Sequence, residues 1–248
     1  MMLRLILILT LPIAARFITG DSTGFFYIAD NQHVIRKIDS TGKEWFRYSD
    51  ITNGSIQSID ASNPFKTLIF YRQQQVIQIL DNNFGLVNTI QLRKNNMLNV
   101  MAVARASDNN IWLYDALDMS IKKINDFGKP VSVGADVFQL TGHIPQVSFM
   151  KEENHKLFVC DTTLGVLVFD EYLNYERTIP MPSVNRLQVV NQSLLHVKGN
   201  TLIQYDLLSR IEKRDSMLLN QPVQSAFLVK RFLIAQEENQ VSLYRILP

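Results

Sequence analysis

The feature that most restricts the fold of this chain is a motif that occurs six times along its 248 residues. Each copy has a run of β-branched or aromatic residues, a few polar residues and a second apolar run, which is the pattern of a β-hairpin. Successive copies end 42, 44, 45, 36 and 39 residues apart. A period of about 40 residues is typical of repeats that hold four short strands each. The copies end at Asp39, Asp81, Asn125, Asp170, Asp206 and Arg245.

Two further strands complete each repeat. Three hairpins are followed by Asp or Asn and then Gly, as in Asp39 with Gly42, a pair that turns the chain into a next strand. An alternating stretch such as 43–49 follows this turn, and another, such as 55–62, precedes each later hairpin. The sequence therefore predicts an all-β fold, a six-bladed β-propeller of four-stranded antiparallel blades.

The first fifteen residues have the layout of a secretory signal peptide. Arg4 precedes eleven mostly apolar residues, and Ala14 and Ala15 supply the small residues of a cleavage site. Eleven residues are fewer than the roughly 17 to 25 that a membrane-spanning helix needs, so we expect no stable membrane span. We expect residues 1–15 to be cleaved, residues 16–248 to form the propeller domain, and the protein to be secreted or periplasmic; an uncleaved anchor is the alternative.

The chain has one cysteine, Cys160, within the apolar run 157–160. Because no cysteine follows the signal segment, the protein is not expected to be a lipoprotein. One thiol cannot form an intrachain disulfide, and its apolar neighbours favour a buried, unreactive side chain.

The two ends of the chain leave one question open. The first hairpin has no clear inner strand before it, and the last hairpin has no outer strand after it. Residues 16–22 are the segment of the mature chain that can close the ring, because propellers commonly complete one blade with the other terminus. The sequence does not decide whether this segment serves the first or the last blade.

Three of the repeats carry a family resemblance. Residues 27–42, YIADNQHVIRKIDSTG, resemble the second half of an NHL repeat, and residues 110–128 and 156–172 are similar. The set is similar to NHL-type or TolB-like six-bladed propellers, a resemblance that implies ligand binding, scaffolding or hydrolysis. Three repeats depart from this pattern, with Arg72, Lys198 and Gln236 where Asp30, Asp115 and Asp161 end the first hairpin strand.

The direction of the chain predicts which loops share one end of the blades. The loop inside each hairpin and the long link to the next blade open at the same end, and loops on a rigid scaffold are where binding sites usually lie. The longest link carries His143. The candidate contacts for a ligand or partner are Arg72, Asp115, Asp118, His143 and Asp161. The alternative is that they are ordinary solvated loop residues.

Charge and motifs limit the chemistry. The chain has 25 basic and 23 acidic residues, a formal net charge of +2, which gives no basic stripe for nucleic acid. The four histidines are scattered singly, and no HExxH, paired CxxC, GxSxG or phosphate-binding glycine motif occurs. The sequence therefore assigns no catalytic residue, metal ligand or cofactor.

These observations favour an exported, non-enzymatic propeller that binds a protein or peptide partner through its loops. The alternative is a small-molecule hydrolase or lyase with a metal on the propeller axis, for which several oxygen ligands must converge on one point. A third possibility is a structural spacer within a larger assembly. Enzymatic activity and oligomeric state stay open.

Overall fold

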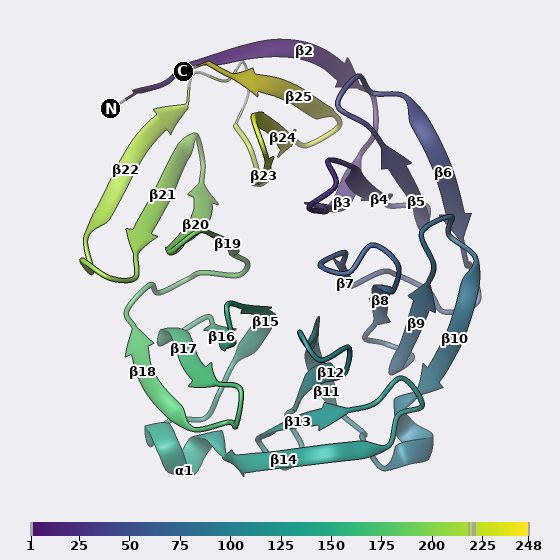
Figure 1. Ribbon diagram of the computed structural model, residues 1–248, viewed down its shortest axis with the longest axis vertical. Coiled ribbons are helices and arrows are strands. Elements are labelled where there is room, and N and C mark those ends of the chain that lie inside the picture. Colours follow the sequence, from purple (N-terminus) through teal and green to yellow (C-terminus); the bar gives the residue numbers. More distant parts are fainter. Residues whose placement is uncertain (1, 218, 220–221, 248) are drawn as a thin grey trace. The chain divides into compact units, whose positions relative to one another are not determined.

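The computed structural model describes residues 2–217, 219 and 222–247. Within this part of the chain the strands form six sheets, and each sheet contains one antiparallel four-stranded blade (Figure 1). The predicted six-bladed β-propeller is thereby confirmed. The first three blades consist of β3 (Ala15–Gly20), β4 (Phe26–Asp30), β5 (Val34–Ile38) and β6 (Glu44–Ser49); β7 (Ser58–Asp60), β8 (Thr67–Tyr71), β9 (Val76–Leu80) and β10 (Leu86–Gln91); β11 (Val100–Arg105), β12 (Ile111–Asp115), β13 (Ser120–Ile124) and β14 (Pro130–Asp136).

The last three blades follow the same order of strands, with one exception at the end of the chain. The sixth blade takes its outermost strand, β2 (Leu5–Leu11), from the N-terminus. The other strands are β15 (Val147–Glu153), β16 (Lys156–Asp161), β17 (Gly165–Asp170) and β18 (Tyr175–Ile179); β19 (Gln188–Val190), β20 (Ser193–Lys198), β21 (Thr201–Asp206) and β22 (Glu212–Met217); β23 (Ser225–Val229), β24 (Phe232–Gln236) and β25 (Val241–Ile246).

The chain divides into two compact units. The first comprises the described residues of 1–67, 82–84 and 188–248, and its core includes Ile28, Ile234 and Leu243. The second comprises residues 68–81 and 85–187. In the second unit, Trp112 of the third blade packs with Leu157 and Phe169 of the fourth in one buried cluster. Along β12, β16 and β17 the residues of this cluster are two positions apart, as the hairpin pattern requires.

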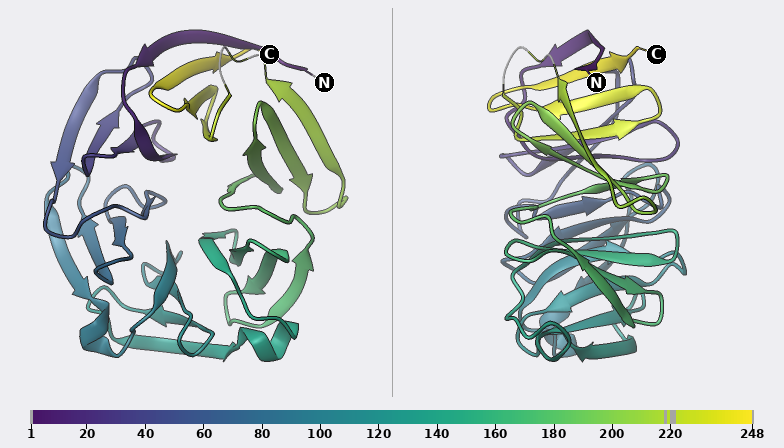
Figure 2. Two further views of the ribbon diagram at one scale, coloured as in Figure 1. Left: turned by 180° about the vertical axis from the view of Figure 1, so that it is seen from behind. Right: turned by 90° about the vertical axis from the view of Figure 1, so that its left-hand side faces the viewer.

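The N-terminal segment answers the question of the two ends. β3 is the first strand of the first blade, so residues 16–20 serve that blade and not the last one. β2 pairs antiparallel with β25, from Leu5 opposite Ile246 to Leu11 opposite Val241, and the two strands lie side by side in both Figures 1 and 2. β1 (Met2–Leu3) pairs in parallel with β22. The cleavage of residues 1–15 stays a prediction.

Aspartates close many of the turns. In a recurrent Asp-x-Ser/Thr arrangement, Asp Oδ1 accepts bonds from both the backbone N–H and the hydroxyl two residues later, as Asp39 does from Thr41. The same two bonds occur at Asp21, Asp50, Asp60, Asp118 and Asp161.

Helix is limited to short pieces in the described residues, namely the 3₁₀ turn η1 (Leu92–Asn95) and the helix α1 (Val137–Thr141). Neither is long and apolar enough to cross a membrane. Asp136 caps the N-terminus of α1, since its carboxylate accepts a bond from the Phe138 N–H, and Gly142, with φ of 70°, caps the C-terminus.

Candidate binding surface

Five loops at one end of the second unit form a continuous, hydrogen-bonded surface. The Leu92 N–H donates to the Gln75 carbonyl, and the Ala116 N–H donates to the Asn99 carbonyl. In the same way the Val137 N–H donates to Met119 and the Thr162 N–H donates to Gln146. Each loop is therefore fixed to the next one. We call residues 72–75, 92–99, 115–119, 137–146 and 161–164 the loop surface; it contains all five residues that the sequence singled out.

Asp161 is fully buried and fixes two loops at once. Its Oδ1 accepts bonds from the Thr163 and Leu164 N–H groups, and its Oδ2 accepts one from the Gln146 N–H at 2.7 Å. Burial alone would raise the pKa of this carboxyl, but the hydrogen bonds from Thr163, Leu164 and Gln146 prevail and lower it. Asp161 is therefore an ionised turn cap with little surface left for a ligand.

His143 joins the loop surface through a short chain of bonds. Its Nε2 lies 2.8 Å from Thr163 Oγ1, which lies 2.6 Å from Asp161 Oδ1. An ionised carboxylate only accepts, so the Thr163 hydroxyl donates to Asp161 and His143 Nε2–H donates to Thr163. The threonine proton is thus committed to the carboxylate, and the imidazole does not act as a base on this hydroxyl.

Asp115 and Asp118 share one lysine in the third blade. Lys122 Nζ lies 2.5 Å from Asp118 Oδ2 and 3.4 Å from Asp115 Oδ2. Asp115 is 1% exposed and also accepts bonds from the Asn99 and Leu117 N–H groups, so it is a structural cap like Asp161. Burial acts against ionisation of Asp118, but the contacts with Lys122 and Ser120 lower the pKa of this carboxyl.

Arg72 is the exposed cation of this set. Its guanidinium contacts the Met101 sulfur at 2.9 Å, while the neighbouring Gln75 is buried and bonds to the Val100 backbone through both its oxygen and its nitrogen. The loop that carries Arg72 is therefore rigid, although the side chain itself faces solvent.

Tyr114 is a buried residue that the sequence did not single out. It is 1% exposed, and its hydroxyl has no hydrogen-bond partner among the residues that the structure describes. Burial and, after it, the negative charges of Asp136 and Asp161 raise the pKa of this phenol far above its ordinary value. Tyr114 therefore stays neutral beneath the loop surface.

Apolar side chains are the second feature of this surface that the sequence did not reveal. Five large hydrophobic residues are exposed on three of its loops, with Ile144 at 65% and Leu117 at 63%. Aliphatic and aromatic residues exposed together on connected loops are typical of protein-binding surfaces. The five are Leu98, Leu117, Phe138, Leu140 and Ile144.

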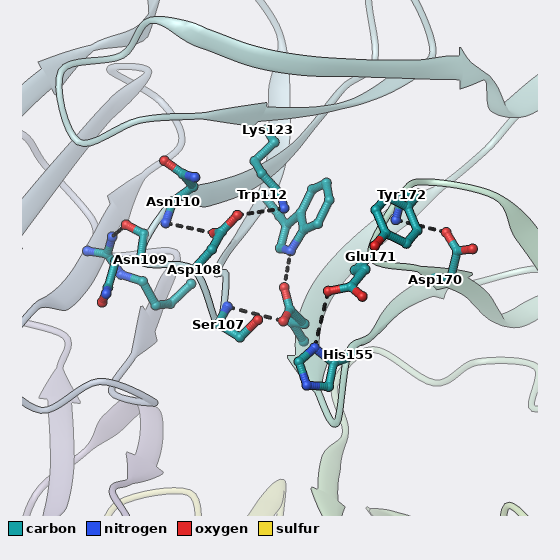
Figure 3. Close-up of polar contacts among 12 residues, drawn as sticks. Ser107, Asp108, Asn109, Asn110, Trp112, Lys123, His155, Asp170, Glu171 and Tyr172 are labelled. Carbon is teal, nitrogen blue, oxygen red and sulfur yellow. Dashed lines mark hydrogen bonds and ion pairs between the residues drawn. The ribbon is translucent and has the colours of Figure 1, made fainter.

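The opposite end of the third and fourth blades carries a different polar cluster (Figure 3). The Trp112 indole N–H and the Ser107 N–H both donate to the buried carboxylate of Glu152, and Lys123 Nζ contacts Asp108 at 2.8 Å. His155 Nδ1 lies 3.2 Å from Glu171 Oε2. Asn154 and His155, both with positive φ, form the tight turn between β15 and β16. The Glu152 contacts connect the third and fourth blades, whereas the Lys123–Asp108 and His155–Glu171 contacts each lie within one blade.

Within the part of the chain that the structure describes, no group of three or more His, Cys, Asp or Glu side chains is arranged to hold a metal ion. Cys160 is buried as expected, and burial raises the pKa of its thiol far above the ordinary value. The thiol is therefore unreactive at neutral pH.

The sequence matches no protein-family model and no curated protein. The fold is similar to solved lyase structures. One is a streptogramin B lyase, with a TM-score of 0.66 and 11% identity over 99% of this chain and 98% of that one. Two are of virginiamycin B lyase from Staphylococcus aureus, a catalytically inactive variant with quinupristin and a selenomethionine form, with TM-scores of 0.62 and 0.60 and 11% identity over 93% of this chain and 80% of each of those. At this identity the likeness establishes a six-bladed propeller and no narrower type; the NHL or TolB-like relationship stays a prediction.

Proposed function

We propose that this chain is an exported propeller that binds a protein or peptide partner through the loop surface. The observation that carries the proposal is the combination of five exposed hydrophobic residues with the exposed Arg72 and the partly exposed His143 on loops that are bonded to one another. Such a surface binds without a large ordering cost, because its backbone is already fixed.

The state of the carboxylates also favours binding over catalysis. Asp115 and Asp161 are buried and accept backbone N–H bonds, so neither is free to act as a base. An apolar surface with the exposed cations Arg72, Arg93 and Lys94 and one imidazole fits a partner segment that has hydrophobic anchors and acidic residues.

The proposal is tested by site-specific photo-crosslinking in the organism that produces the protein. A photoreactive amino acid at position 144 is expected to give one cross-linked partner, and the change Phe138→Asp is expected to abolish that product. The matched control is position 172, since Tyr172 is 79% exposed at the opposite end of the fourth blade. Equal products from positions 144 and 172, or no product from 144, would contradict the proposal.

Export is a separate part of the proposal. It is supported by the basic residue, the apolar run and the small residues at 1–15. The intact mass of the protein recovered outside the cytoplasm is expected to correspond to a chain that begins near residue 16. Recovery of the uncleaved chain only from the cytoplasm would count against export.

A second candidate function is that of a small-molecule lyase or hydrolase. It is supported by the names of the similar structures and by the partly exposed His143, which is held in place by Thr163. The probe is quinupristin, followed by mass spectrometry. Under this candidate the purified protein opens the antibiotic and His143→Ala does not; an unchanged antibiotic with both proteins removes its support.

A further inference from the structure

The strand that completes the sixth blade is the most apolar of the six outer strands. β2 has the sequence LILILTL, which contains no charged residue. The outer strands β6, β18 and β22 each carry acidic and basic residues, which discourage pairing with other chains. β14 carries one aspartate, and β10 is uncharged but half polar. β2 is therefore an apolar strand that lies outermost in its sheet, with one edge paired to β25.

β2 is held on the sixth blade by both backbone and side chains. Its register with β25 runs over six residue pairs, with an irregularity between Leu7 and Leu9. Thr10 Oγ1 lies 3.3 Å from Ser242 Oγ, and the Leu247 N–H donates to the Arg4 carbonyl at 3.0 Å. Ile8, Leu9 and Leu11 pack against the core of the sixth and first blades.

Leu9 shows how closely this groove fits an apolar strand. Gly42, in a turn of the first blade, has φ of 85°, and a Cβ at this position would overlap with the side chain of Leu9. The groove beside β25 therefore has room for a large aliphatic side chain at this register position because its neighbour is glycine. Ile6, in contrast, is 51% exposed and contributes little to the fit.

Export with cleavage near residue 15 would remove residues 5–11, whereas the pairing with β25 requires them. Cleavage near residue 15 would take β2 away and leave β25 as an edge strand with unpaired backbone groups beside an apolar groove. An edge of this kind binds extended segments by strand addition, in which the backbone supplies affinity and alternate side chains supply specificity.

We propose that the outer edge of β25 is an acceptor site for an extended, uncharged apolar strand, and that in the exported protein this strand comes from a partner protein. This inference rests on the export part of the proposed function. In the uncleaved chain residues 5–11 fill the site, and they define the ligand that it takes: an antiparallel strand with aliphatic residues at the positions of Ile8, Leu9 and Leu11.

Strand exchange into the full chain tests the acceptor site. A protease recognition sequence is placed at the exposed Pro12, the chain is folded, and the site is then cut. The probe is a fluorescent peptide with the sequence of residues 2–11, made soluble by added C-terminal lysines. We expect the cut chain to take up the peptide. The half-maximal rise in anisotropy is expected to need at least a ten-fold lower concentration of cut chain with this peptide than with the Leu9→Asp peptide. The peptide with Ile6→Asp is the matched control and is expected to bind.

A cross-link supplies a second measurement, in which β2 is held on β25 and cannot leave the site. In the double variant T10C/S242C the two new thiols replace hydroxyls that face each other, and the native Cys160 is buried. We expect the oxidised variant to cross-link and, after cutting, to exclude the peptide, while the reduced variant takes it up. Equal uptake of the Leu9→Asp peptide, or uptake by the oxidised variant, would overturn the proposal.

Two outcomes separate this inference from the proposed function. Phe138→Asp on the loop surface is expected to leave strand exchange unchanged, because it lies in the other unit. If the intact mass of the exported protein includes residues 5–11, the site is filled by the chain itself and the partner strand is ruled out, whatever the loop surface binds.

Discussion

At the scale of single residues, most of the aspartates in this chain are parts of turns. The carboxylate of Asp39 accepts bonds from the Thr41 and Lys43 N–H groups, the Thr41 hydroxyl and the Trp45 indole. Asn125 occupies the equivalent turn of the third repeat and accepts bonds from Phe127 and Lys129. An uncharged amide therefore accepts the same backbone bonds as the carboxylate. The turn needs these hydrogen bonds and does not need the charge.

This equivalence leads to a prediction about pH. Burial alone would raise the pKa of Asp39, but the hydrogen bonds from Thr41, Trp45 and Lys43 together lower it to about 2, from an ordinary value of 3.8. A group with a lowered folded-state pKa stabilises the fold above its unfolded-state pKa and loses this effect as pH falls toward the folded value. The effect of Asp39 is therefore complete above about pH 4 and lost near pH 2.

The measurement is the urea midpoint of the wild type and of Asp39→Asn at pH 6 and pH 3. We expect the variant to lose less stability between the two values, by under about 1 kcal/mol because the carboxylate is largely solvated. An equal loss in the two proteins would show that ionisation of Asp39 does not contribute.

At the scale of elements, one glycine determines how the fourth blade turns. Gly165 begins β17 with φ of 114°, and a Cβ there would overlap with the Ile179 carbonyl oxygen and the Met181 N–H. These backbone atoms cannot move aside as the end of a flexible side chain can. The hairpin of β16 and β17 therefore depends on the absence of a side chain at this position.

We predict that Gly165→Ala lowers the free energy of unfolding by about 3 kcal/mol. The matched control is Gly142→Ala, since Gly142 also has positive φ, at 70°, but has nothing within 4 Å of a Cβ. The control is expected to cost about 1 kcal/mol, the strain of the backbone alone. Chemical denaturation of both variants measures the difference, and similar losses would mean that the overlap is relieved elsewhere.

Prediction from sequence worked best for the strands and hairpins. The hairpins and the number of blades follow from alternation and period, which are properties of neighbouring residues. The sequence also found Asp115 and Asp161, but not that they are buried caps, because burial depends on how the preceding loops, with Asn99 and Gln146, pack against them. It did not find Leu98 or Ile144, since apolar residues in a loop look the same in a sequence whether they are exposed or packed.

At the scale of the whole molecule, the N-terminal segment connects parts of the first unit that are far apart in sequence. β1 pairs with β22 of the fifth blade, β2 pairs with β25 of the sixth, and Leu9 contacts Gly42 of the first. The sequence could not reveal this role, because an apolar run of this length suits a signal peptide and a buried strand equally.

We predict that in the uncleaved chain the amide hydrogens of β25 exchange with solvent as slowly as those of β24. β25 lies between β24 and β2, so backbone groups on both of its edges are bonded. The reference is β18, the last strand of its sheet. Hydrogen exchange followed by mass spectrometry measures all three strands, and exchange in β25 as fast as in β18 would mean that β2 detaches readily.

The two tryptophans provide a built-in optical reporter for each unit. Trp112, in the second unit, is fully buried beneath Lys123, whereas Trp45, in the first, is 49% exposed and meets Phe25 edge to face. Their emission should differ in wavelength and in quenching by iodide. A single sample heated in a fluorimeter would therefore reveal whether the two halves of the chain melt together or in turn, without any added dye.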